Sequence, residues 1–171
     1  MAHAKGEAIV GLGQFLFGLS GRVNRKPYWL FMLGAFLIYF VILGNIVAVF
    51  MAYGLDGRDT DTMAKVGVII MVTMLVMFWP GIAVLVKRMH DRNRSGWWIA
   101  VAYAMSFSAW VLSKDAFNAE TGEVLDKALF AVFLPVSIVA AILWLWLIVE
   151  VGFLRGSRGT NSFGPDPIAG T

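Results

Sequence analysis

The chain of 171 residues is 59% hydrophobic and only 15% charged, whereas soluble domains are about half apolar and a quarter charged. This excess of apolar residues excludes an ordinary soluble domain and indicates an integral membrane protein of single-domain size. The absence of cysteine excludes disulfides and thiolate metal sites, and a net charge of +3 is weak evidence for nucleic-acid binding.

An amphipathic segment lies near the N-terminus, over residues 8–20. Gly11, Gln14 and Gly18 recur at helical spacing and form a polar stripe opposite a row of aliphatic side chains. This pattern predicts a short helix that lies in the membrane interface.

Four apolar segments follow, and each is expected to cross the membrane as an α-helix. Three are long enough to span ~30 Å of hydrocarbon, whereas the third is short and, taken alone, is also compatible with a re-entrant or interfacial segment. The predicted fold is an all-α single domain with spans over 28–53, 64–86, 97–112 and 128–154 and an irregular tail over 155–171.

The distribution of charge favours four crossings. Most of the 14 Lys and Arg residues fall before the first segment, between the second and third, or after the fourth. The two remaining loops carry most of the acidic residues. Because positively charged loops stay in the cytosol, we expect both termini and the loop 87–96 to face the cytosol.

Small residues recur every four positions on two of the predicted spans. They are Gly44, Ala48 and Ala52 on the first, and Ala100, Ala104 and Ser108 on the third. Such stripes let helices approach closely in lipid. We expect them to pack inside the four-helix bundle, and dimerisation of the chain is the alternative.

Three polar pieces of the chain should meet on the cytosolic side: residues 21–29, 87–98 and 159–167. Ser95 is placed to N-cap the third span. Asp91 can pair with Lys87 one helical turn earlier.

Glu150 is the one acidic residue within a predicted span, near its cytosolic end. A carboxylate at this depth requires a cation, so we expect it to pair with Lys87, Arg88 or Arg22.

The three pieces resemble the family of bacterial inner-membrane proteins called domain of unknown function 805. In that family an Arg-rich segment ending in Tyr-Trp precedes the first span, and a basic His-Asp…Ser-Gly-Trp loop divides the spans. An Asn-x-aromatic-Gly-x-Asp-Pro tail closes the chain. The matching residues are Tyr28, Trp29, His90, Asp91, Ser95, Gly96, Trp97, Asn161, Phe163, Gly164, Asp166 and Pro167.

The resemblance covers about residues 15–167 and implies a multi-span protein of the bacterial cytoplasmic membrane. Pro27 departs from it, because a polar residue is more usual at that position. The resemblance brings no activity, since the family's function is itself unassigned.

The favoured functional hypothesis is a binding or assembly protein. Its basic cytosolic face would engage anionic lipid headgroups or an acidic partner, and the chain could also form homo-oligomers. The alternative is that these charges only set topology. The candidate anion-binding residues are Arg22, Arg25, Arg88, His90, Asp91, Arg92 and Arg94.

Two other classes of function have less support. A small transporter or channel subunit would need a polar stripe or charged ring, which no span carries. A membrane-surface enzyme could use His90 as general base, but adjacent helical residues point about 100° apart, so Asp91 is badly placed to hold that imidazole. We therefore assign no catalytic residue, cofactor or metal, and expect no nucleic-acid partner.

Overall fold

The structure, a computed structural model, describes residues 11–53, 60–118 and 121–168. Within these ranges the only β-structure is two isolated bridges, so the all-α prediction is confirmed. The helices are α1 (Leu12–Phe17), α2 (Arg25–Tyr53), α3 (Thr60–Asp91), α4 (Trp97–Ala116) and α5 (Lys127–Ile148), which continues as the short π-helix η1 (Val149–Phe153).

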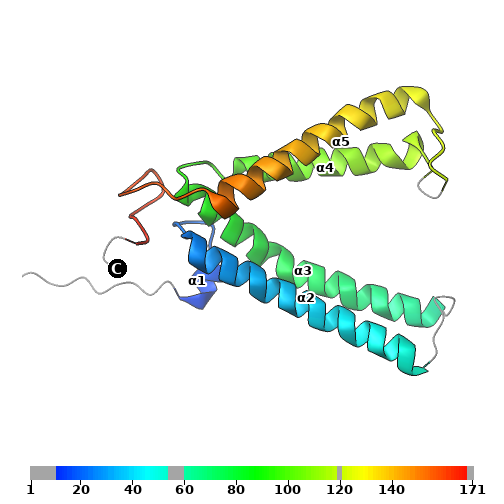
Figure 1. The fold of residues 1–171 in the computed structure, drawn as a ribbon, viewed down its shortest axis with the longest axis horizontal. Coiled ribbons are helices and arrows are strands. Elements are labelled where there is room, and N and C mark those ends of the chain that lie inside the picture. The colour runs from blue at the N-terminus through cyan, green and yellow to red at the C-terminus, as the bar shows by residue number, and fades with distance from the viewer. Residues whose placement is uncertain (1–10, 54–59, 119–120, 169–171) are drawn as a thin grey trace, which may run out of the picture.

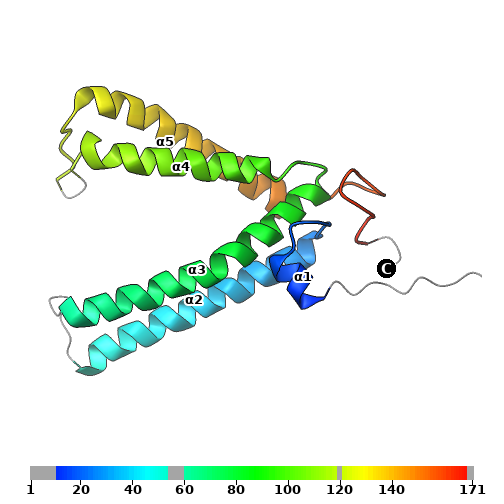
Figure 2. The same ribbon diagram turned by 180° about the vertical axis from the view of Figure 1, so that it is seen from behind.

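The long helices form two hairpins that diverge like the arms of a V (Figure 1). One arm is α2 with α3, and the other is α4 with α5, as the view from behind also shows (Figure 2). We call the vertex the converging end: here the start of α2, the end of α3, the start of α4 and η1 meet. The opposite, open end carries the α2–α3 and α4–α5 connections.

The helix boundaries refine the predicted ones. Helix α1 stops at Phe17, because Gly18 adopts an extended conformation, so the predicted interfacial helix is shorter than expected. Helix α3 continues to Asp91, so the first half of the predicted loop 87–96 is helical. Residues 8–10 of the predicted interfacial helix and 169–171 of the predicted tail lie outside the described residues.

Three helices in the described ranges are long and apolar enough to cross a membrane: α2, α3 and α5 with η1. Helix α4 is not among them, although it has 20 residues and ends at Ala116 rather than at 112. Its Trp, Tyr and Ser residues and the pair Lys114–Asp115 lower its hydropathy.

The buried core lies at the converging end. By contrast, no residue is buried in the most apolar stretch of α2. The outer parts of both arms therefore present apolar side chains to their surroundings, as expected in a bilayer. The core cluster comprises Val23, Tyr28, Val84, Met89, Ile99, Ala102, Leu147 and Val151.

Polar and aromatic contacts join the helices within and between the arms. The indole Nε1 of Trp144 on α5 donates to the Ser106 hydroxyl on α4 over 2.9 Å. The ring of Tyr103 on α4 lies 5.1 Å from Trp144 and 5.7 Å from Phe78 on α3, both edge-on. Tyr103 therefore contacts both arms.

The small-residue stripes do not pack inside the molecule. Ala100, Ala104 and Ser108 are exposed, and α4 instead buries Ile99, Ala102, Ala109 and Ala116. Gly44, Ala48 and Ala52 on α2 are exposed as well. The expectation of intramolecular packing was wrong, because four-residue spacing fixes which residues share a face but not where that face points.

Candidate functional site

Arg22 joins the three polar pieces of the sequence at the converging end. Its side chain, only 1% exposed, donates from Nε and Nη2 to Asp91 Oδ1 over 3.2 and 3.0 Å. It also donates to the carbonyls of Ser157 (2.6 Å), Gly159 (2.7 Å) and Gly164 (3.2 Å) in the tail. The predicted meeting of the three pieces is confirmed, with Arg22 at its centre.

Asp91 lies between two buried guanidinium groups. Arg88, one turn earlier on α3, donates from Nη1 to Asp91 Oδ2, while Arg22 holds the other oxygen. The predicted pair with Lys87 was wrong. Two cations around one carboxylate leave a local excess of positive charge, which backbone carbonyls of the tail and η1 help to balance.

Lys87 points to α1 instead of Asp91. Its ammonium donates to the carbonyls of Gln14 (2.9 Å), Phe15 (2.5 Å) and Gly18 (2.7 Å). A helix leaves its last carbonyls without partners, and a cation there is favoured by the helix dipole. Lys87 thus uses all three donors to hold the C-terminal end of α1 against α3.

The carbonyls of five consecutive residues, 151–155, each accept a side-chain hydrogen bond from α2 or from the end of α3. The donors are Arg25, Trp29, Arg88 and Arg92. These bonds run from Arg88 Nε to Val151 (2.7 Å), Trp29 Nε1 to Gly152 (3.0 Å), Arg25 Nη1 to Phe153 (3.2 Å), Arg88 Nη2 to Leu154 (2.5 Å) and Arg92 Nη1 to Arg155. The orphan carbonyls at the end of the last helix are therefore satisfied by the other arm of the V.

Glu150 lies within η1 and is buried. Its Oε1 accepts from Arg92 Nε over 3.1 Å and lies 3.6 Å from Arg94 Nε. The expected partners Lys87, Arg88 and Arg22 were wrong, because all three point to other acceptors. Arg94 remains 53% exposed at its side chain.

The C-terminal tail docks on the end of α3 through His90 and Asp91. The imidazole of His90 stacks on the ring of Phe163 with centroids 3.9 Å apart, and Asn161 Nδ2 donates to the His90 carbonyl over 2.8 Å. The backbone N–H of Ser157 donates to the Asp91 carbonyl over 2.8 Å. His90 and Asp91 therefore tie the tail to the end of α3.

His90 does not form a catalytic pair with Asp91. Its Nδ1 lies 3.2 Å from the carbonyl of Gly21, whereas the Asp91 carboxylate is held by Arg22 and Arg88. Among the described residues, no three His, Asp or Glu side chains lie close enough together to hold a metal ion.

The Asn-x-Phe-Gly-x-Asp-Pro motif folds the tail into two linked turns. Asn161 and Gly164 exchange backbone hydrogen bonds, and Gly164 has a φ of +135°, which suits glycine. The Asp166 carboxylate accepts the N–H groups of Ile168 (3.1 Å) and Gly159 (2.9 Å). These two bonds lower the pKa of Asp166, so it is ionised at neutral pH.

Gly156 is a site residue that the sequence did not reveal. A Cβ atom at this position would lie 2.0 Å from Asp91 Oδ2. Only glycine lets the tail pass directly over the buried carboxylate. Within the sequence, nothing distinguishes Gly156 from the other glycines of the tail.

Ser95 and Gly96 shape the turn into α4. Ser95 Oγ accepts the N–H of Trp97 over 3.2 Å, although the helix boundary places the N-cap at Gly96. A Cβ on Gly96 would lie 2.9 Å from a methyl of Val86. Trp97 itself is exposed.

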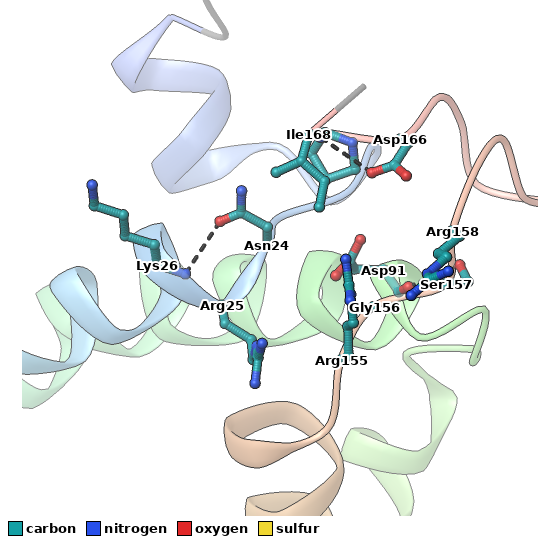
Figure 3. Close-up of a pocket in the computed structure, with 11 residues that line it drawn as sticks. Asn24, Arg25, Lys26, Asp91, Arg155, Gly156, Ser157, Arg158, Asp166 and Ile168 are labelled. Atoms are coloured by element: carbon teal, nitrogen blue, oxygen red, sulfur yellow. Dashed lines mark hydrogen bonds between the residues drawn. The ribbon is translucent and has the colours of Figure 1, made fainter. Parts of the chain in front are cut away.

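A cavity of about 350 Å³ opens between the start of α2 and the tail (Figure 3). Arg155 and Arg158 from the tail are exposed, and within the described part of the chain neither side chain has a hydrogen-bond or ion-pair partner. Figure 3 shows the Lys26 side chain extending away from the tail residues. The lining residues are Asn24, Arg25, Lys26, Asp91, Arg155, Gly156, Ser157, Arg158, Asp166, Pro167 and Ile168.

This cavity changes which cations are available to a ligand. Of the predicted anion-binding residues, Arg22 and Arg88 are engaged by the protein itself, while Arg25 and Asp91 line the cavity. Arg155 and Arg158 were considered only for topology, because their position after the last span gave no sign of a cavity beside them.

Comparison with known proteins relates most of the chain to proteins of Escherichia coli. The uncharacterised protein YiiR of Escherichia coli is 27% identical over 90% of this chain and 88% of its own length. The inner membrane proteins YhaH and YhaI of the same organism are 29% and 30% identical, over 61% and 56% of this chain and 78% and 69% of theirs. No solved structure matches the fold. The profile described as "Protein of unknown function (DUF805)" matches residues 16–165, and the chain therefore belongs to this family.

Proposed function

We propose that the protein crosses the bacterial inner membrane four times, with the converging end in the cytosol, and that it binds anionic phosphate groups of membrane lipids there. Two relatives are named as inner membrane proteins, which supports the location. The cavity beside Arg155 and Arg158 supports the binding activity.

The fourth crossing rests on α4. Its 20 residues give a length of ~30 Å, which matches the hydrocarbon core. It lies alongside α5, and the Trp144–Ser106 hydrogen bond satisfies two polar groups between them. With four crossings, every basic segment at the converging end occupies the same aqueous compartment.

Single-cysteine labelling tests the topology, because the chain has no cysteine of its own. In right-side-out vesicles of the inner membrane, we expect Arg158→Cys to react with an impermeant maleimide only after the vesicles are opened and their cytosolic side is exposed. Glu123→Cys, at the open end, should react from the opposite side. Labelling of both positions from the same side would overturn the four-span arrangement.

The unengaged arginines are the single observation that carries the binding proposal. Arg155 and Arg158 lie on the cavity with free guanidinium groups, and Arg25 lines its far side. Of the two acidic residues of the lining, Asp91 is neutralised by two arginines, whereas Asp166 is a partly exposed anion within reach of the charge of Arg155. Four cations of the lining outnumber it: Arg25, Lys26, Arg155 and Arg158. The accessible charge is therefore positive.

A guanidinium fork suits a phosphate group, and a juxtamembrane cation attracts anionic lipid by ~1 kcal/mol. Two free arginines therefore correspond to about thirtyfold in affinity. Arg155 lies two residues after the end of η1, and a position so close to the end of the last span supports binding to headgroups of the cytosolic leaflet.

Native mass spectrometry of the protein from bilayers of phosphatidylethanolamine and phosphatidylglycerol tests the binding. We expect the Arg155→Ala/Arg158→Ala protein to retain far less phosphatidylglycerol than the wild type. The control, Lys65→Ala/Lys127→Ala, removes the same charge at the open end and should retain wild-type amounts.

Equal loss of phosphatidylglycerol in both double variants would mean that retention depends only on the net charge of the protein. That result would overturn the cavity as the binding site. The wild type could instead retain an acidic protein and no phosphatidylglycerol. If only Arg155→Ala/Arg158→Ala lost that protein, the ligand of the cavity would be a protein partner and not a lipid.

A further inference from the structure

Helix α1 packs against α3 near the converging end (Figures 1 and 2), and residues of α1, α2 and α3 together line a groove there. Helix α1 separates two cavities. One, of about 220 Å³, has a mostly apolar lining to which Gln14, Ser20 and Asn24 add polar groups, and we call it the polar cavity because it is the more polar of the two. The other, of about 320 Å³, has an apolar lining that includes Leu16 and Phe17 of α1. Neither cavity belongs to the site of Arg155 and Arg158.

The two cavities follow the same groove. On α2, Pro27 lines the polar cavity, and Phe31 and Ala35, at intervals of four residues on the same face, line the apolar one. On α3, Lys87 lines the polar cavity and Pro80, two turns earlier, lines the apolar one. The groove therefore changes from polar to apolar along its length, towards the middle of the helices.

The apolar cavity has room at Gly34. A Cβ atom at this position would meet nothing within 4 Å, although the residue is partly buried in the groove. A volume of 320 Å³ lies at the lower end of the range for ligand pockets, ~300–1,000 Å³. Such a slot suits a narrow hydrocarbon chain.

Helix α1 is fixed over the groove by polar contacts as well as by packing. Lys87 holds three of its carbonyls, and Trp79 Nε1 donates to the Phe17 carbonyl over 3.1 Å. The ring of Phe15 lies edge-on to Phe31 at 6.3 Å. A chain in the groove would thus be covered by protein, unlike the lipids that surround the outer faces of the arms.

The charge at the polar end of the groove indicates the headgroup. Lys26 lines the cavity between the start of α2 and the tail (the tail cavity) and precedes Pro27, which lines the polar cavity. Its exposed ammonium has no partner among the described residues and extends away from the tail. By contrast, Arg22 and Lys87 in the wall of the polar cavity already donate to internal acceptors. An anionic group bound here would find its free cation at Lys26.

The geometry points to an anionic phospholipid bound under α1, with one acyl chain in the apolar cavity and its phosphate beside Lys26 and the polar cavity. This site adjoins the one at Arg155 and Arg158, because Lys26 lines the tail cavity and Asn24 and Pro167 line both the tail cavity and the polar cavity. The two sites differ in the apolar cavity, which shares no lining residue with the tail cavity.

Photolabelling locates the chain. The full-length protein is placed in vesicles of phosphatidylethanolamine and phosphatidylglycerol that contain phosphatidylglycerol with a diazirine on one acyl chain. After irradiation, we expect the label to concentrate on Leu16–Phe17 and on the segment around Gly34, compared with the exposed apolar segment around Ile142 on α5. Uniform labelling of both segments would show ordinary surrounding lipid and overturn the site.

A matched pair of variants tests the cavity itself. Gly34→Phe fills the slot, whereas Gly44→Phe adds the same ring to an exposed face of the same helix, where a Cβ also meets nothing. We expect labelling of α1 to fall about tenfold in the first variant only. Equal labelling of α1 in both variants would overturn the proposal. If Gly34→Phe does not fold, the distribution of the photolabel along the wild-type chain tests the proposal instead.

The charge requirement is tested by Lys26→Gln. We expect labelling of α1 by the phosphatidylglycerol probe to fall about fivefold, with no change for a phosphatidylethanolamine probe. Wild-type labelling by both probes would remove the role of Lys26. Arg155→Ala/Arg158→Ala should leave the label on α1 unchanged, and its loss there would show that the lipid belongs to the tail cavity instead.

Discussion

The two ends of the molecule are held by different forces. At the converging end, buried arginine, lysine and carboxylate groups bind each other and the backbone carbonyls of α1, η1 and the tail. Towards the open end, α2 is exposed along its apolar length, and its polar residues bond within their own helix, as Asn45 does to the Val41 carbonyl. In a bilayer the apolar arms gain little from mutual burial, so polar bonds at the vertex fix how the arms are joined.

The largest loss of stability is expected for Arg88→Met. This change leaves the carbonyls of Val151 and Leu154 without their donor and removes one of the two cations from buried Asp91. Breaking such a buried pair costs about 3–5 kcal/mol. Unfolding by SDS in mixed micelles measures the change.

Arg88→Lys is the matched control for charge. It keeps the positive charge but cannot supply the three directed donors, so we expect an intermediate loss of stability. Wild-type stability in Arg88→Lys would mean that charge alone, and not the bonds to η1, holds the arms together.

Gly156→Ala should also destabilise the converging end, by about 1–3 kcal/mol, because its Cβ would overlap the Asp91 carboxylate. Gly67→Ala provides the control, since a Cβ at that position on α3 meets nothing within 4 Å. The same unfolding assay compares the two. Equal effects would contradict the close passage of the tail over Asp91.

Phe163→Ala removes the ring that stacks on His90 and should loosen the tail without separating the arms. The stacking contributes about 0.5–1.5 kcal/mol, so the amides of Ser157 and Asn161 should exchange hydrogen up to about tenfold faster. Phe36→Ala, which removes an exposed ring stacked on Phe40 within α2, should leave this exchange unchanged.

The smallest effect is expected away from the vertex, for Ser106→Ala. It removes the acceptor of Trp144 Nε1 between α4 and α5, and interhelical hydrogen bonds in membranes average ~0.6 kcal/mol. Ser108→Ala, whose hydroxyl bonds to Ala104 of its own helix, is the matched control. A loss as large as that of Arg88→Met would contradict the division between the two ends.

The sequence predicts the helices well because hydropathy and length decide them. The apolar segments and the approach of Arg22, Asp91 and Asn161 follow from local pattern and topology. The ionic partners do not, because several cations near Glu150 and Asp91 are equivalent in sequence. Only the rotation of α3 selects Arg92 for Glu150 and directs Lys87 to α1.

Glycine positions show the same limit. Gly156 and Gly34 look like ordinary tail and helix glycines in the sequence, yet one admits a neighbouring carboxylate and the other leaves space in a groove. Such roles depend on which distant residue approaches, and spacing along one helix carries no information about that.

The hydrogen bonds to residues 151–155 have a consequence for how the chain is made. Arg25 and Trp29 precede their acceptors by 128 and 123 residues, and Arg88 and Arg92 precede theirs by 63 to 66 residues. These donors are therefore synthesised before α5 and cannot reach their acceptors until α5 is complete. The tail carbonyls at 157–164 that accept from Arg22 are made later still, so we expect a chain truncated before them to leave the buried charge of Arg22 without these acceptors.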